Sequence, residues 1–204
     1  MNQILNLFKK DFYERIGGLS PFRGMIVLDI GCGDGEDSLA ISRFAKKVTG
    51  IDVVEDKKWD KIKNRKLNFV VGDAQRLPFE KNRFNGVFLK DVLHHVTDPE
   101  RVLKEIKRVA VKGPLIILIE GNRYNPLFYI HMTKLGGHDH LKQGQFKELI
   151  LKYFPNAQFV HFESHFIPFI NKSLFMLIIE VEKFVDRIDF LRPILSYNAS
   201  IIKG

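Results

Sequence analysis

The stretch VLDIGCGDG, residues Val27 to Gly35, decides the fold. An apolar run typical of a buried β-strand passes through Asp29 and ends in three glycines, each separated from the next by one residue. Because glycine has no Cβ and adopts positive φ angles at little cost, a ligand can come close to the main chain at such a turn. A helical pattern begins at Glu36. The stretch therefore predicts a strand, a glycine turn and a helix whose first amide groups face a polar ligand.

Strands and helices alternate outward from this turn. We expect strands near 24–31, 48–52, 67–74, 83–90, 113–122, 156–166 and 197–204, and helical segments near 4–15, 36–48, 59–63, 98–111, 143–154 and 173–190. The order Asp98, Pro99, Glu100 is typical of a helix start with Asp98 as its N-cap. Alternation through the first 120 residues or so predicts a parallel sheet with helices on both faces, on which ligands bind outside the carboxyl ends of the strands.

Polar side chains stand at these strand ends. Asp29 and the glycines end the first predicted strand, Asp52 the second, Asp73 the third, and Lys90 with Asp91 the fourth. The Asp52 carboxylate can accept hydrogen bonds from both hydroxyls of a ribose, and Asp73 can accept one from the amine of a base. The dinucleotide fingerprint G-x-G-x-x-G does not fit, because Gly35 comes one residue early. The pattern favours a nucleoside that carries an amino acid.

The composition indicates one globular α/β or α+β domain. The chain has 204 residues, a net charge of +8 and a single cysteine, Cys32, which cannot form an internal disulfide. We expect Cys32 to pack under the glycine turn rather than to act as a nucleophile. No apolar run reaches the roughly 20 residues of a membrane span, and the N-terminus lacks a signal-peptide pattern, so we expect a cytoplasmic protein. The positive charge leaves nucleic acid open as a partner, although the lysines are spread out.

Several motifs in sequence order resemble those of one family. VLDIGCGDG, VTGID and the segment from VVGDAQRLPFEKNRF to GPLIILIE resemble the successive motifs of class I S-adenosylmethionine-dependent methyltransferases. Within that family the chain is most similar to the group that includes the ubiquinone and menaquinone C-methyltransferases, closely over about residues 25–120. The resemblance implies a doubly wound α/β sheet of seven strands with the last one antiparallel. It also implies S-adenosylmethionine as methyl donor and S-adenosylhomocysteine as product.

The resemblance also implies a set of cofactor-binding residues: Asp29, Gly31, Cys32, Gly33, Asp52, Val53, Asp73, Ala74 and Lys90. Gly31 and Gly33 would lie against the methionine part, and Asp29 would help to hold its ammonium group. Asp52 would bind the ribose, while Asp73 and the Ala74 amide would bind the adenine. Lys90 occupies the position that lines the methyl-donor end, and its charge beside a sulfonium leaves the direction of its side chain open. We expect Trp59 to fill the core, the alternative being that it covers the adenine.

The chain reads as a single methyltransferase domain, 1–204. It divides into an N-terminal helix (1–20), a cofactor-binding core (21–120) and an acceptor-side region (121–204) that contains an inserted helix at about 173–190. The last third is rich in aromatic and aliphatic residues, which favours a small apolar acceptor such as a lipid-like or quinone-like molecule. The inserted helix could cover the acceptor pocket, form a dimer or touch lipid, so peripheral membrane contact and a monomer or homodimer stay open.

Methyl transfer from a sulfonium needs mainly in-line positioning, and a base matters only when the acceptor must lose a proton. The catalytic residue is unknown, and the candidates are His94, His95, His138 and His140. The His138 and His140 spacing permits a metal, but nothing further in the sequence completes a site, so no metal is expected. Two alternatives remain: a methyltransferase of RNA or protein, and a protein that binds S-adenosylmethionine without catalysis.

Overall fold

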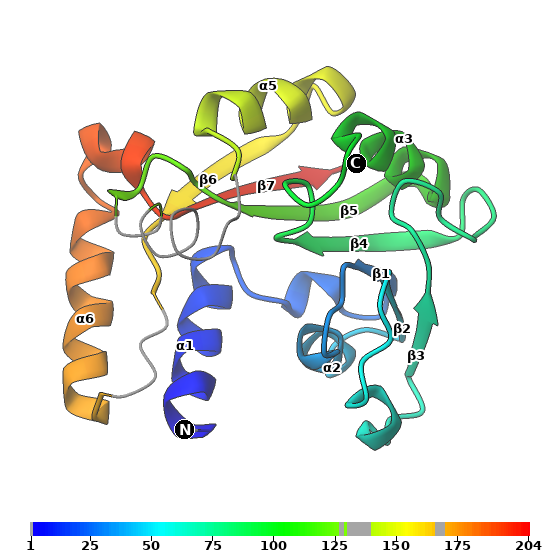
Figure 1. Ribbon diagram of the computed structural model, residues 1–204, viewed down its shortest axis with the longest axis horizontal. Coiled ribbons are helices and arrows are strands. Elements are labelled where there is room, and N and C mark those ends of the chain that lie inside the picture. Colours follow the sequence, from blue (N-terminus) through cyan, green and yellow to red (C-terminus); the bar gives the residue numbers. More distant parts are fainter. Residues whose placement is uncertain (1, 127–128, 130–139, 166–169) are drawn as a thin grey trace.

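The computed structural model describes residues 2–126, 129, 140–165 and 170–204. Its centre is a seven-stranded sheet in the order β3-β2-β1-β4-β5-β7-β6 (Figure 1). The strands are β1 Ile26–Ile30, β2 Lys47–Asp52, β3 Leu67–Val71, β4 Phe84–Lys90, β5 Ala110–Gly121, β6 Gln158–Phe162 and β7 Tyr197–Lys203. The first five are parallel, and β7 runs antiparallel to both β5 and β6. The predicted α/β fold, with its last strand antiparallel, is confirmed.

Helices cover both faces of this sheet, as the alternation predicted. The described α-helices are α1 Asn2–Arg15, α2 Glu36–Ser42, α3 Pro99–Val109, α5 Gln143–Tyr153 and α6 Lys172–Val185; the described 3₁₀ helices are η1 Ser20–Phe22, η2 Trp59–Lys61 and η4 Asp189–Ile194. Figure 1 places α3 and α5 above the sheet and α1 and α2 below it, with α6 at the left beside α1. The N-cap prediction is confirmed, since the Arg101 amide donates to Asp98 Oδ1 at 3.0 Å.

The two cores follow from the alternation of side chains along each strand. Leu28, Val87 and Ile116 belong to the core that includes residues of α3 and α5, whereas their chain neighbours Val27, Phe88 and Ile117 belong to the core of α1 and α2. Both sides of β1, β4 and β5 are therefore apolar, as expected for strands buried on two faces. The strand ends are left as the places where polar side chains can meet a ligand.

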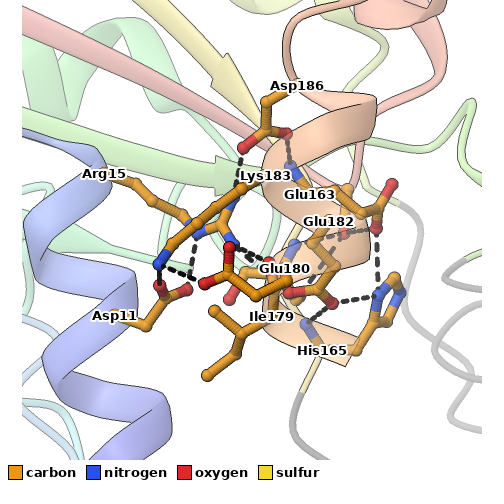
Figure 2. Close-up of polar contacts among 11 residues, drawn as sticks. Asp11, Arg15, Glu163, His165, Ile179, Glu180, Glu182, Lys183 and Asp186 are labelled. Atoms are coloured by element: carbon orange, nitrogen blue, oxygen red, sulfur yellow. Dashed lines mark hydrogen bonds and ion pairs between the residues drawn. The ribbon is translucent and has the colours of Figure 1, made fainter. Parts of the chain in front are cut away.

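A network of charged residues joins α1 to α6 (Figure 2). The guanidinium of Arg15 bonds to Asp11 Oδ2 at 2.6 Å, pairs with Asp186, and lies 3.5 Å from Glu182 Oε2. His165, which follows β6, contacts the same Glu182 carboxylate at 3.5 Å. Beside these charges Ile4 of α1 packs against Phe175 and Ile179 of α6. The inserted helix is thus fastened to α1.

Several predicted boundaries were wrong. The helix predicted over 36–48 ends at Ser42, because the amides of Lys46 and Lys47 bond to the Met25 carbonyl and draw the chain toward β1. The segment near 59–63 is only a 3₁₀ turn, Trp59–Lys61. The helix at 98–111 ends at Val109, and β5 begins at Ala110, before the predicted start.

The end of the chain also departs from the prediction. Strand β6 covers Gln158–Phe162, shorter than the predicted 156–166, and the end of that range lies outside the described residues. The helix predicted over 173–190 ends at Val185, because the amides of Arg187 and Ile188 bond to carbonyls three residues earlier and tighten the chain. Across the described residues, no helix combines the length and the apolar character that a membrane crossing requires.

Candidate active site

A cavity of about 290 Å³ lies where the carboxyl ends of β1 to β4 meet. It is lined by Gly31, Ile51, Asp52, Val53, Gly72, Ala74, Asp91, Val92 and His95. Five of the predicted site residues are therefore brought together: Gly31, Asp52, Val53, Ala74 and His95. Segments far apart in the sequence converge here because β1 pairs with both β2 and β4 in parallel register.

The glycine turn forms one wall of this cavity. The amides of Gly31 and Cys32 both donate to the Ile51 carbonyl, at 2.8 and 3.1 Å, which fixes the turn to the end of β2. Gly31 has a φ of +71°, and a Cβ at this position would lie 2.1 Å from Val92 Cγ2. Gly33 has a φ of +48° and open space around its missing Cβ. The turn thus requires glycine at Gly31 for two separate reasons, and leaves the main chain at Gly33 accessible.

Asp52 fixes the turn from the other side. Its Oδ2 accepts from the Gly33 amide at 2.9 Å and its Oδ1 from the Val54 amide at 3.2 Å. A carboxylate has about four acceptor sites, so two remain for ligand hydroxyls. The neighbouring Val53 is 64% exposed and lines the cavity. The pair offers acceptors for a sugar beside an apolar surface for a flat base.

Asp73 and Ala74 follow β3. The exposed Asp73 carboxylate accepts from the Gln75 amide at 2.8 Å and contacts the Gln75 side chain. Ala74 is buried and lines the cavity, whereas Asp73 is not among the lining residues. The adenine role of Asp73 stays a prediction, and the structure places its carboxylate at the rim of the site.

Asp29, Cys32 and Lys90 are not among the lining residues of this cavity. Asp29 is buried and accepts a 2.5 Å hydrogen bond from Ser38 Oγ, and burial raises its pKa to about 7. Burial also raises the pKa of the Cys32 thiol, which suits the predicted packing role. Lys90 Nζ lies 3.0 Å from Asp37 Oδ2. The charge of Lys90 is thus paired on the α2 side of the sheet.

Trp59 packs beside the glycine turn and donates a hydrogen bond to it. Its ring is buried and stacks on Phe69, with centroids 4.9 Å apart, and its indole N–H donates to the Gly33 carbonyl at 2.8 Å. The expectation that Trp59 fills the core is the one that the structure supports.

A cluster of histidines adjoins the cavity. His94 Nδ1 lies 2.6 Å from Glu120 Oε2, and the side chains of the two residues are 2% and 0% exposed. Glu120 Oε1 accepts from the amides of Val92 and Leu93 at 2.9 and 2.6 Å. The rings of His95 and His140 each lie 4.0 Å from the His94 ring. The candidate His138 lies outside the described residues.

The sequence reasoning missed Glu120 as a site residue, and it named Asp91 only as a polar residue at the end of the fourth strand, without a role in the site. Glu120 ends the apolar run LIILIE, so the strand-end rule that found Asp52 could also have found it. Asp91 lines the cavity, has a φ of +55°, and accepts from the Gly121 amide at 3.2 Å. Burial raises the pKa of Asp91 to about 6. A positive φ in a residue other than glycine is strained and is found disproportionately at functional sites.

Comparisons with known proteins agree with this geometry. A family model described as a methyltransferase domain matches residues 28–118. A demethylmenaquinone methyltransferase of Staphylococcus aureus is 37% identical over 107 residues, which is 48% of this chain and 44% of that protein. The match thus spans less than half the length of that curated relative.

Solved structures share the fold over most of the chain. A methyltransferase from Archaeoglobus fulgidus, described as dependent on S-adenosylmethionine, is 20% identical, with a TM-score of 0.66 over 98% of this chain and 94% of that one. The [4+2]-cyclase SpnF is 17% identical, with a TM-score of 0.61 over 99% and 94%. At such identities the likeness concerns the fold alone.

The residues present fit S-adenosylmethionine. Gly31 provides a wall without a side chain, Asp52 keeps two acceptor sites, and Val53 is exposed beside it. These features meet in one cavity at the strand ends, where sheets of this topology bind ligands. A methyltransferase-domain family model thus matches residues 28–118, and the chain as a whole shares the fold of solved S-adenosylmethionine-dependent methyltransferases.

Proposed function

We propose that the protein transfers the methyl group of S-adenosylmethionine to a small apolar acceptor by in-line displacement. The observation that carries this proposal is the convergence of Gly31, Asp52 and Ala74 on the cavity at the ends of β1 to β3. Gly31 and Gly33 would hold the methionine part, Asp52 the ribose, and Val53 with Ala74 the adenine. Most of the rate enhancement would come from holding donor and acceptor in line, since effective molarity contributes about 7–11 kcal/mol in well-oriented reactions.

Two observations favour a lipid-like or quinone-like acceptor. The curated relative's name is that of an enzyme acting on demethylmenaquinone. Helix α6 presents the apolar side chains Leu177, Val181 and Phe184 to solvent, and Phe190 in η4 is 79% exposed. Monomeric soluble proteins seldom expose a contiguous apolar patch without a partner. We propose that this stripe touches a membrane surface, from which an apolar acceptor is taken.

An acceptor that must lose a proton would bind next to the histidine cluster. His95 lines the cavity, and behind it His94 is held by Glu120. We propose that the acceptor group binds on this side of the cofactor, where it faces His95.

The proposal is tested with labelled S-adenosylmethionine. Purified protein is incubated with labelled cofactor and a short-chain demethylated naphthoquinone, and separately with cell lipid extract, RNA and protein fractions. We expect label in the quinone or lipid fraction, and loss of that label with Asp52→Ala. Label only in RNA or protein would overturn the acceptor class and favour the alternative suggested by the +8 charge.

Binding of S-adenosylmethionine without catalysis is the second alternative, because a fold alone does not fix a function. Tight binding of S-adenosylhomocysteine, with no label transferred to any fraction, would favour that alternative.

A further inference from the structure

Two imidazoles and a carboxylate meet in one buried place beside the cofactor cavity. One ligand atom from each of His94, Glu120 and His140 lies within 4.8 Å of the other two. The three residues come from different parts of the fold: the loop after β4, the end of β5, and the segment before α5. Glu120 and His140 are 0% and 3% exposed, and the His94 side chain is 2% exposed. The fold therefore holds three possible metal ligands together out of bulk water.

We propose that His94, Glu120 and His140 bind a divalent first-row transition-metal ion, for which Zn²⁺ is the probe. Two histidines and one glutamate are a ligand set of zinc sites that keep a further position for water or substrate. Nδ1 of His94 and Oε2 of Glu120 are 2.6 Å apart. With zinc bonds of about 2.0–2.1 Å at a tetrahedral angle, they must separate to about 3.3 Å. Binding thus replaces a hydrogen bond by coordination with a small side-chain movement.

The surroundings of Glu120 suit a ligand of this kind. Its Oε1 accepts hydrogen bonds from the Val92 and Leu93 amides. Its Oε2 is therefore the oxygen that faces the two imidazoles. Hydrogen bonds of this sort orient a ligating carboxylate. Asp91 adds a second carboxyl group, whose Oδ1 accepts from the amide of Gly121, the residue after Glu120. Two carboxylates can balance the charge of a divalent ion in this buried place.

The ion would fasten the loop after β4 to the acceptor side of the molecule. That loop contributes Asp91, Val92 and His95 to the cofactor cavity, while His140 belongs to the segment that leads into α5. This role rests on the proposed function, whereas metal binding itself does not.

The experiment titrates chelator-treated, dialysed protein with Zn²⁺ by calorimetry and by competition with a chromophoric chelator. We expect one ion per chain, and an affinity at least about tenfold lower in His140→Ala and in Glu120→Gln. The matched control is His161→Ala, because His161 is a partly buried histidine on β6 that bonds to Asn198 Oδ1 at 2.9 Å. Its removal should leave zinc binding unchanged.

Two further measurements separate coordination from a structural effect. Co²⁺ should give the visible absorption of a tetrahedral site, and His140→Ala should remove it. His140→Cys, which exchanges one zinc ligand for another, should restore binding and add a thiolate charge-transfer band. The proposal is overturned if no saturable binding is found, or if His140→Ala folds as judged by circular dichroism and still binds Zn²⁺ with unchanged affinity.

The closing comparison uses S-adenosylhomocysteine with metal-free protein. Zinc binding without binding of this product would keep the metal site and remove the proposed function. Binding of the product without zinc binding would support the proposed function and remove the metal site.

Discussion

At the scale of single residues, Asp52 carries the sharpest prediction. Its carboxylate already bonds the Gly33 and Val54 amides, and we assign its remaining acceptor sites to the ribose. Asp52→Ala should weaken binding of S-adenosylhomocysteine by about 1–3 kcal/mol, because the amides and the sugar hydroxyls lose their acceptor. Calorimetry measures the affinity for S-adenosylhomocysteine directly. The variant Asp73→Ala, at the rim of the site, serves as the comparison. Unchanged affinity in Asp52→Ala would remove the ribose assignment.

Gly31 and Gly33 offer a matched pair. Both have positive φ, but only at Gly31 would a Cβ overlap a neighbour, Val92. We expect Gly31→Ala to lower the free energy of unfolding by about 2–4 kcal/mol, from backbone strain plus overpacking, and Gly33→Ala by about 1–2 kcal/mol, from strain alone. Urea unfolding of both variants checks this. Equal losses would mean that Val92 moves aside freely.

At the scale of elements, the α1–α6 network in Figure 2 predicts a pH dependence. Burial alone lowers the pKa of His165, but its hydrogen bonds to Glu163 and Glu182 outweigh that effect and raise the pKa to about 9. A folded-state pKa above the ordinary value of 6.5 means that the stabilisation is fully present below pH 6.5. It is lost as the pH rises to about 9.

The measurement compares the normal protein with His165→Gln between pH 6 and 9.5. The free energy of unfolding of the normal protein should fall more steeply above pH 6.5, by at most about 1.4 kcal/mol per pH unit. Parallel curves for the two proteins would show that His165 does not hold its proton in the folded state.

Helix α6 has one buried and one exposed apolar face. Ile179 is packed against α1, whereas Leu177 and Phe184 are 60% and 64% exposed. Replacing Leu177 and Phe184 together by lysine should change stability by less than about 1 kcal/mol and abolish binding to lipid vesicles. Ile179→Lys should instead destabilise the fold. Vesicle co-sedimentation and urea unfolding separate the two, and retained vesicle binding in the double variant would contradict lipid contact through α6.

At the scale of the whole molecule, local signals predicted the elements well. Asp98 could be named as an N-cap because capping depends on residues three positions apart. The convergence on one cavity could be predicted because parallel strands bring their carboxyl ends to one edge. The end of α2 could not be predicted, because the hydrogen bonds from Lys46 and Lys47 to Met25 depend on strand pairing.

Contacts between side chains that are distant in sequence could not be predicted, for the same reason. Lys90 stands at a strand end like Asp52, yet it pairs with Asp37 of α2. His94 was a candidate from its place after β4, but its partner Glu120 lies at the end of another strand. Such pairs depend on the packing of elements, which sequence periodicity does not encode.

The central claim, that the cavity at the ends of β1 to β4 binds S-adenosylmethionine, is tested most directly by calorimetry. The protein is titrated with S-adenosylhomocysteine and, separately, with a nicotinamide dinucleotide. The account predicts saturable binding of one S-adenosylhomocysteine per chain, weakened in Asp52→Ala, and no binding of the dinucleotide. Saturable binding of the dinucleotide, or failure of S-adenosylhomocysteine to bind to folded protein, would contradict it.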